Sequence, residues 1–279
     1  MAGLRWYEKY KERLDVPQMI EETIFPHQRI GDLIVVAAIA GILGSKVFTW
    51  FEDWENFMRD PMAAILSFNG LMFYGGLICG SIALVIYARI AKIPIWRMTD
   101  AAGMAVIVGY GVGRLGCHFS GDGDWGITNN FVRPDWLTWL PDWAWAYTYP
   151  HNVINEGIRL ANCSMPCCID VPGCATRYCS VLPEGVFPTS VYEFVMAMAI
   201  FGILYLLRKR ISTAGILFGI FLIFNGIERF LIEFIRINDQ HIFFGIQLSF
   251  SQYIALGLVA LGIGVIGLRA GADKTVDNG

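Results

Sequence analysis

The chain has 279 residues, of which 55% are hydrophobic and 16% are charged, and its formal net charge is -3. Because soluble domains carry about 25% charged residues, this composition argues against an ordinary soluble protein and indicates an integral membrane protein. The small net charge gives no reason to expect nucleic acid as a partner. Residues 1–29 are rich in charge and lack the apolar core of a cleavable signal peptide. We expect them to form a cytoplasmic N-terminal segment.

Six apolar segments follow along the chain, each close to the roughly 20 residues that a membrane-spanning helix needs. Three fall within residues 30–118 and three within residues 188–270. Their predicted bounds are 31–51, 70–90, 100–118, 188–207, 213–235 and 249–268. Periodicity alone does not distinguish them from buried helices of a large soluble protein, but six such segments with so few charges favour the membrane. We therefore predict an all-α integral membrane protein with about six transmembrane helices.

The distribution of lysine and arginine between the spans predicts the orientation. Basic segments precede the first span, join the second to the third and the fourth to the fifth, and follow the sixth. Basic loops stay on the cytoplasmic side of a membrane, so both termini are expected in the cytoplasm, with residues 271–279 as a tail. The long polar insertion, residues 119–187, is then expected on the extracytoplasmic side.

Five of the seven cysteines lie close together within that insertion. They are Cys163, Cys167, Cys168, Cys174 and Cys179. Such a cluster outside the cytoplasm predicts disulfide bonds. Zinc binding is the alternative, but it is less favoured because the segment "CSMPCCIDVPGCATRYC" contains no CxxC pair and no nearby histidine.

The fifth predicted span carries charges that are costly in a membrane, on the order of 2.5–3.5 kcal/mol each. They are Glu228, Arg229, Glu233 and Arg236. Arg229 and Glu233 are four positions apart and are expected to pair on one helix face. Arg236 is expected on the same face, nearer the outer surface. The alternative is an internal salt bridge with an arginine that snorkels to the interface.

The end of the third span, "GYGVGRLGCHFSGDGDWG", carries Arg114 and His118. Two arginines on different helices, Arg114 and Arg229, can converge on one anion, and in an apolar slot the simplest anion is a lipid phosphate. The alternatives are a snorkelling anchor for Arg114 and a structural interfacial role for His118. Glycines in the second and third spans allow close helix packing and also leave room for a substrate.

Four motifs in order, "FYGGLICG", "GRLGCHFSGD", "PTSVYE" and "RFLIEFIR", resemble those of the prolipoprotein diacylglyceryl transferase family, and "SQY" resembles its final-helix motif. The resemblance covers about residues 30–270 apart from much of 130–187. It implies an enzyme of the bacterial cytoplasmic (inner) membrane, with its active site toward the outer side. Such an enzyme transfers the diacylglyceryl group of phosphatidylglycerol to the thiol of the lipobox cysteine in a lipoprotein precursor and releases glycerol 1-phosphate. It needs no metal and no cofactor.

The resemblance also implies roles for particular residues. Arg114 and Arg229 would stabilise charge on the leaving phosphate, while Glu233 orients Arg229. The implied substrate-binding residues are Gly75, Gly76, Asp122, Tyr192, Glu193 and Arg236.

This chain departs from the family pattern at several positions. It has Cys117 where the signature has asparagine, Asp122 where it has glutamate, and Tyr74 where many members have a histidine that is a candidate base. His118 and Tyr74 are therefore both candidates for the group that accepts the thiol proton. The usual first spanning helix is also expected to be missing. The alternative functions are a diacylglyceryl transferase with another acceptor, or a non-catalytic phospholipid-binding or transport protein.

Overall fold

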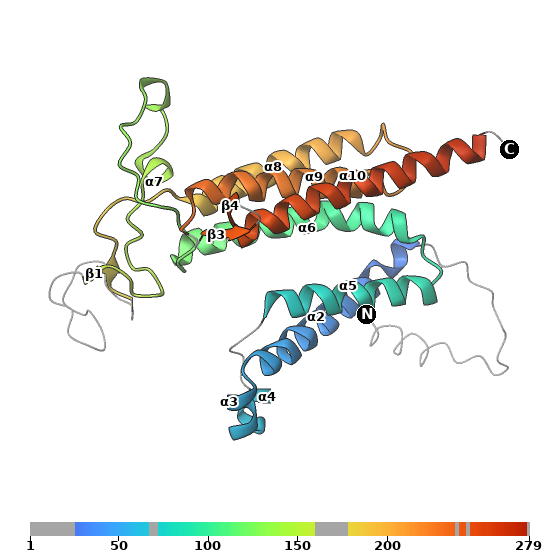
Figure 1. Cartoon of the computed structure of the whole chain (residues 1–279), viewed down its shortest axis with the longest axis horizontal. Helices are drawn as coiled ribbons and strands as arrows, with labels where there is room; N and C mark the ends of the chain where they lie inside the picture. The colour runs from blue at the N-terminus through green and yellow to red at the C-terminus, as the bar shows by residue number, and fades with distance from the viewer. Residues whose placement is uncertain (1–25, 67–71, 160–177, 238–239, 244–245, 278–279) are drawn as a thin grey trace, which may run out of the picture. The chain divides into compact units, whose positions relative to one another are not determined.

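A computed structural model describes residues 26–66, 72–159, 178–237, 240–243 and 246–277. Long helices dominate this part of the chain (Figure 1). The chain divides into two compact units, Met1–Met98 and Thr99–Gly279, and each is described separately.

The first unit is built on two helices that lie side by side, α2 (Ile30–Glu52) and α5 (Phe73–Ile90). A 3₁₀ turn, η1 (Pro26–Arg29), precedes them, and the short helices α3 (Trp54–Arg59) and α4 (Pro61–Leu66) lie between them in the chain. The two helices approach closely because glycines face each other. A Cβ on Gly44 would lie 2.6 Å from the carbonyl oxygen of Gly75, and a Cβ on Gly76 would lie 3.1 Å from that of Gly41.

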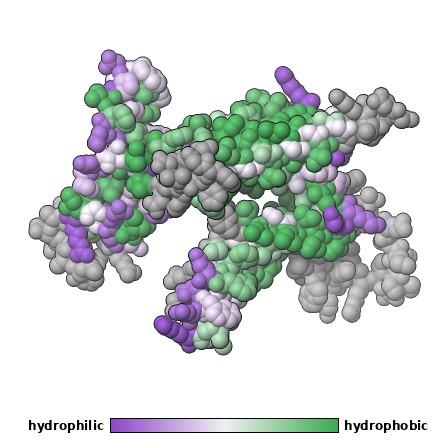
Figure 2. All heavy atoms as spheres, in the orientation of Figure 1, coloured by the Kyte–Doolittle hydropathy of each residue, from purple (hydrophilic) through white to green (hydrophobic). Residues whose placement is uncertain are grey.

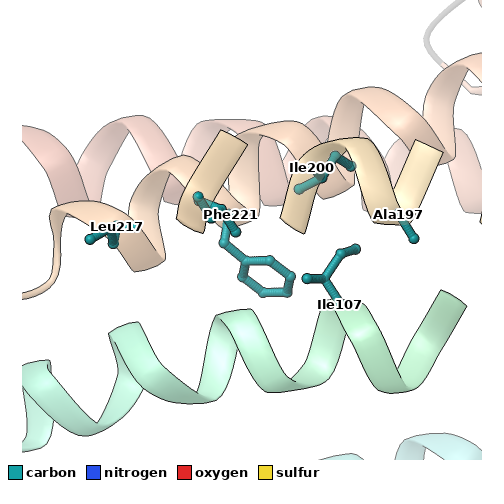
Figure 3. Close-up of a cluster of buried hydrophobic side chains, with 6 residues drawn as sticks. Ile107, Ala197, Ile200, Leu217 and Phe221 are labelled. Carbon is teal, nitrogen blue, oxygen red and sulfur yellow. The ribbon is translucent and has the colours of Figure 1, made fainter. Parts of the chain in front are cut away.

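The second unit contains four long helices: α6 (Ile95–Ser120), α8 (Thr189–Leu207), α9 (Ile216–Ile232) and α10 (Phe250–Asp277). Apolar side chains from α6, α8 and α9 form a common core, in which Ile107 faces Phe221 and Ala197 (Figure 3). The buried members of this core are Ile107, Ala197, Ile200, Leu204, Leu217 and Phe221. The short connection after α8, residues 208–215, makes α8 antiparallel to α9, and α8 also runs antiparallel to α6 (Figure 1). The core is therefore a layered helix bundle.

Asp100 of α6 joins α6 to the start of α9 at one end of the bundle. Its two carboxylate oxygens accept hydrogen bonds from the backbone N–H groups of Gly215 and Phe218, both at 2.8 Å. The first N–H groups of a helix have no partner within the helix, and a carboxylate also suits the positive end of the helix dipole. Asp100 therefore caps α9 and fixes it against α6.

Helices α9 and α10 pack through small residues. A Cβ on Gly226 would lie 2.6 Å from the carbonyl oxygen of Ala255, and a Cβ on Gly219 would lie 2.9 Å from that of Gly262. Such close backbone approach is a typical way for helices to associate in a membrane. It places the end of α9 directly beside the start of α10.

Residues 121–188 lead from α6 to α8 and contain, in the described part, short elements only. These are η2 (Asp135–Leu137), α7 (Asp142–Trp145) and the antiparallel strands β1 (Ile158–Arg159) and β2 (Ser180–Val181). The buried Asn152 organises the segment, because its side-chain nitrogen donates to the carbonyls of Tyr149, Glu156 and Ser180. The backbone turn here is tight, with φ of +43° at Tyr149.

The six helices predicted from the sequence are all present, with bounds close to those expected. Three of them, α2, α8 and α10, are long and apolar enough to cross a membrane. Helix α9 has 17 residues and is about 26 Å long, because the chain tightens into the 3₁₀ turn η3 (Glu233–Ile235). The number of six spans therefore stays a prediction.

Two other expectations need correction or stay open. The all-α class is incomplete, since β3 (Gln240–Phe243) and β4 (Ile246–Ser249) form an antiparallel hairpin in addition to β1 and β2. The sixth helix also continues to Asp277, into the expected tail.

Four residues of the cysteine cluster, Cys163, Cys167, Cys168 and Cys174, lie outside the described residues. Cys179 is buried and is not one of the described free thiols, Cys79 and Cys117, and its disulfide pairing stays a prediction.

The lateral surfaces of the long helices are apolar. Figure 2 shows hydrophobic residues along the helices of each unit and hydrophilic ones mainly in the segments that connect them. Exposed side chains such as Leu206 on α8 and Leu261 on α10 belong to these surfaces. A continuous apolar surface on fully hydrogen-bonded helices suits contact with lipid tails.

We expect Gly226→Ala to lower the thermal unfolding temperature of the detergent-purified protein by several degrees. The new Cβ would lie within 2.8 Å of Val259 Cγ2 and force α9 away from α10, at a cost of about 1–3 kcal/mol. Gly257→Ala is the matched control, because a Cβ at this α10 position meets nothing within 4 Å. Circular dichroism measures both, and equal unfolding temperatures would contradict the close α9–α10 packing.

Candidate active site

Four helix ends meet at one end of the second unit: the last turns of α6 and α9 and the first turns of α8 and α10. Arg114 comes from α6, Glu193 from α8 and Arg229 from α9, and their charged groups are in contact. The antiparallel bundle thus gathers charged side chains from distant parts of the sequence. The opposite end carries the Asp100 cap.

Glu193 lies at the centre of this group with 0% of its side chain exposed. Its Oε2 lies 3.0 Å from Arg114 Nε, and its Oε1 lies 3.4 Å from both Arg229 Nη1 and Arg236 Nη1. A carboxylate buried without partners would be very costly, so the three guanidinium groups are what keep it charged. The Glu193 carboxylate in turn holds the three guanidinium groups together.

Asp124, four residues after the end of α6, supplies a second carboxylate. Its Oδ1 lies 2.7 Å from Arg236 Nη2, and its Oδ2 pairs with Arg114 Nη1. Burial alone would raise the pKa of this carboxyl, but Arg236 and Arg114 outweigh burial and lower it below its usual value. The ion pairs of Asp124 therefore stabilise the folded protein in full above the ordinary carboxyl pKa of about 4. This stabilisation is lost as the pH falls through the lower pKa that Asp124 has in the folded state.

The expectation that Arg236 shares a helix face with Arg229 is wrong. Helix α9 ends at Ile232, and Arg236 follows η3 with an extended backbone, φ -87° and ψ 154°. This backbone forms an antiparallel bridge with Gly126, and Ile127 donates its N–H to the Ile235 carbonyl at 2.9 Å. Arg236 reaches Glu193 because the chain after α9 is tied to the loop after α6.

The start of α10 completes the group. Arg229 Nη2 lies 3.2 Å from Glu233 Oε2, which confirms the pair expected from the sequence, and it donates to Ser251 Oγ at 3.0 Å. Ser249 donates its hydroxyl to Glu233 Oε1 at 2.6 Å. Gln252 accepts a hydrogen bond from the Ser249 N–H at 3.0 Å. The side chain of Arg229 is therefore fixed by groups from α8, η3 and α10.

His118 lies one turn beyond Arg114 on α6, in an aromatic pocket. Its Nδ1 is 3.1 Å from the Tyr149 hydroxyl oxygen, and its ring contacts Tyr147 and Trp143. Burial raises the pKa of Tyr149 above its usual value, so this hydroxyl stays protonated. No contact between His118 and the arginines occurs among the described interactions.

The other predicted site residues have other partners in the described part of the chain. Tyr192 donates its hydroxyl to the Ala144 carbonyl at 2.9 Å and so joins α8 to the insertion. Asp122 is exposed and accepts from the Asp124 N–H at 3.3 Å. Gly75 and Gly76 lie at the α2–α5 contact in the first unit, and the side chain of Tyr74 lies outside the described part.

The chemistry of the group suits an anion. Cys117 Sγ and carboxylate oxygens of Asp122 and Asp124 lie within 4.8 Å of one another, but Asp124 is already paired with two arginines that would repel a cation. Three guanidiniums at one point, partly buried, instead favour oxygen atoms of a phosphate.

Several residues of the group were not predicted as site residues. Asp124 was missed because no spacing rule links a loop aspartate to Arg236. Ser251 and Gln252 belong to the "SQY" motif but were given no role in the site, and Ser249 had no signal in the sequence. Glu228, which accepts a hydrogen bond from the Tyr110 hydroxyl at 3.3 Å, had a signal in its charge within an apolar span.

The fold and the cluster together define a class of protein: a helical membrane protein with partly buried arginines suited to a phosphate. A family model described as prolipoprotein diacylglyceryl transferase matches residues 14–268. The chain therefore belongs to the prolipoprotein diacylglyceryl transferase family, which confirms the resemblance seen in its motifs.

Similar proteins with the name phosphatidylglycerol–prolipoprotein diacylglyceryl transferase come from several bacteria. The one from Symbiobacterium thermophilum is 28% identical over 239 residues, 84% of this chain and 74% of the relative. The one from Marinomonas sp. is 29% identical over 245 residues, covering 86% and 76%. The one from Bacillus cytotoxicus is 26% identical over 267 residues, covering 94% and 81%.

We expect Glu193→Gln to destabilise the protein by about 3 kcal/mol, because it removes the buried charge that three partly buried arginines share. Thermal unfolding in detergent measures the change. Glu184→Gln makes the same substitution at an exposed position just before α8 and should leave the unfolding temperature unchanged. A Glu193→Gln protein as stable as the wild type would show that the arginines do not depend on this carboxylate.

Proposed function

We infer that this chain transfers the diacylglyceryl group of phosphatidylglycerol to the thiol of a cysteine in a lipoprotein precursor. The observation that carries this inference is the convergence of Arg114, Arg229 and Arg236 on Glu193 at one end of the bundle. Three guanidinium groups at one point suit a phosphate, and the family of this chain supplies the reaction that a phosphate site would serve.

In this reaction the thiolate sulfur attacks the carbon of the diacylglyceryl group that is bonded to the phosphate oxygen. The new C–S bond forms as the C–O bond breaks, and the bonding electrons leave with glycerol 1-phosphate. Negative charge grows on the phosphate, and fixed positive groups in a site of low dielectric constant stabilise it strongly. Arg114 and Arg229 take this role in our proposal.

Glu193 and Glu233 orient these arginines rather than contact the lipid. Glu193 is fully buried beneath the guanidiniums, and Glu233 is held by the Ser249 hydroxyl. Arg236 lies next to Arg114 through their shared partner Asp124, and we assign it to the lipid headgroup. Such preorganisation avoids a cost of reorientation during the reaction.

The thiol of the acceptor must lose its proton to attack. His118 is our first candidate for the base, because it stands one turn from Arg114, and Tyr149 fixes its ring through Nδ1. Tyr74 is the second candidate. Asp122 is exposed close to this turn, and Tyr192 joins α8 to the insertion. We assign both residues to contact with the incoming precursor.

The proposed setting is the cytoplasmic (inner) membrane of a bacterium. Both termini would be cytoplasmic and all six helices would span, so the arginines would lie toward the outer side. There the lipobox cysteine of a precursor and phosphatidylglycerol in the outer leaflet can both reach them. The alternation of basic segments along the sequence supports this orientation.

We expect Arg229→Lys to lower the transfer rate about 100-fold or more, because a lysine cannot contact Glu193, Glu233 and Ser251 at once. The assay mixes purified protein, phosphatidylglycerol and a lipobox peptide, and measures both glycerol phosphate release and the lipidated peptide by mass spectrometry. Arg133→Lys is the control, since Arg133 pairs with Asp142 at 2.6 Å in the insertion. Lipid binding without release in the wild type would favour a non-catalytic lipid-binding protein.

We expect His118→Gln to lower the rate near neutral pH by about 100-fold and to recover much of it near pH 9. At that pH the acceptor thiol, with a pKa of about 8.5, ionises without a base. A pH–rate profile against the wild type measures this. A full rate at pH 7 would exclude His118 as the base and leave Tyr74, which Tyr74→Phe tests.

A further inference from the structure

The carboxylate of Asp124 contacts two arginines in the arrangement expected for a bound phosphate. One oxygen contacts Arg236 Nη2 at 2.7 Å and the other contacts Arg114 Nη1. A phosphate binds two guanidiniums in the same way, with one non-bridging oxygen to each. The side chain of Asp124 therefore occupies a position that an anionic ligand of these arginines would need.

The side chains of Asp124 and Glu193 differ in how freely they can move away from the arginines. Glu193 has 0% of its side chain exposed and is covered by three arginines, whereas Asp124 has 32% exposed. Asp124 follows a loop in which Gly121 and Gly123 have φ of +60° and +98°. The partly exposed side chain of Asp124 has solvent to turn into, whereas the fully buried side chain of Glu193 has none.

The backbone of Asp124 is held independently of its carboxylate. The hydroxyls of Thr189 and Ser190 donate to its carbonyl oxygen at 2.8 and 2.9 Å. The bridge between Gly126 and Arg236 fixes the chain two residues further on. Release of the carboxylate thus requires rotation of one side chain, while the loop and Arg236 stay in place.

We propose that Asp124 is a built-in competitor for the phosphate, and that the phosphate group of the lipid displaces its carboxylate from Arg114 and Arg236. This inference rests on the proposed function. The exchange replaces one negative charge by another, because a phosphodiester carries a single charge. The balance between the three arginines and the carboxylates of Asp124, Glu193 and Glu233 is therefore preserved when the lipid binds.

The same competition acts on the product. Glycerol 1-phosphate is a phosphate monoester with a charge of about -1.5 to -2 at pH 7, so it would bind the arginines more strongly than the lipid does. The return of the Asp124 carboxylate favours its release. Asp124 therefore weakens the binding of both donor and product, and it belongs to the affinity-setting residues of the site.

The test is the affinity of Asp124→Asn for phosphatidylglycerol in nanodiscs and for glycerol 1-phosphate and inorganic phosphate in solution. Without the competing charge, we expect phosphatidylglycerol to bind about tenfold more tightly than to the wild type, because the lipid phosphate no longer has to displace a carboxylate from two guanidinium groups. Asp124→Ser provides a second neutral variant if the first folds poorly. Asp124→Glu keeps the competing carboxylate and should bind close to the wild-type affinity.

Asp142→Asn is the matched control, because Asp142 also pairs with an arginine but has 95% of its side chain exposed in the insertion. Tighter binding of both phosphatidylglycerol and glycerol 1-phosphate in the neutral Asp124 variants and not in this control supports the displacement. Tighter phosphatidylglycerol binding with unchanged glycerol 1-phosphate binding would overturn the proposed effect on the product. Unchanged or weaker phosphatidylglycerol binding would overturn the displacement and assign Asp124 to positioning the arginines. Tightening for the free phosphates alone would also overturn it. A wild-type protein that neither binds phosphatidylglycerol nor releases glycerol phosphate would instead defeat the proposed function.

Discussion

The Glu193 carboxylate is removed from water completely, and three arginines from three separate segments depend on it. Neither side of this arrangement is stable alone, because a buried carboxylate needs partners and three guanidiniums at one point repel each other. Substitution of Glu193 would therefore affect Arg114, Arg229 and Arg236 together. The rest of the second unit can be understood as the scaffold that brings these four groups to one place.

That scaffold works through contacts distributed along the whole bundle. Asp100 caps α9 at the opposite end of the bundle, and the glycines of α9 and α10 set the distance between those two helices. Because helices are stiff, a shift at either contact would move Arg229 relative to Glu193. The position of the arginines is thus determined along the full length of the bundle, and the small residues are as necessary as the charged ones.

The helices of this protein were predictable from the sequence, because apolar segments of about 20 residues leave few alternatives. The Arg229–Glu233 pair was predictable for a similar reason, since residues four positions apart are neighbours on a helix surface and the chain turns only slightly more tightly at Glu233. The role of Asp124 was not predictable, because it depends on how a loop is tied to the chain after α9. Arg236 was assigned to the site, but its backbone was misplaced, because no residue near Ile232 signals the end of the helix.

The meeting of four helix ends has an electrical consequence beyond the side chains. The starts of α8 and α10 bring partial positive charge to the site, and the ends of α6 and α9 bring partial negative charge. These two pairs of backbone dipoles largely cancel, unlike in phosphate sites that rely on the start of a single helix. The backbone therefore contributes little net attraction for an anion, and the preference for phosphate rests on a few side chains that single substitutions can change.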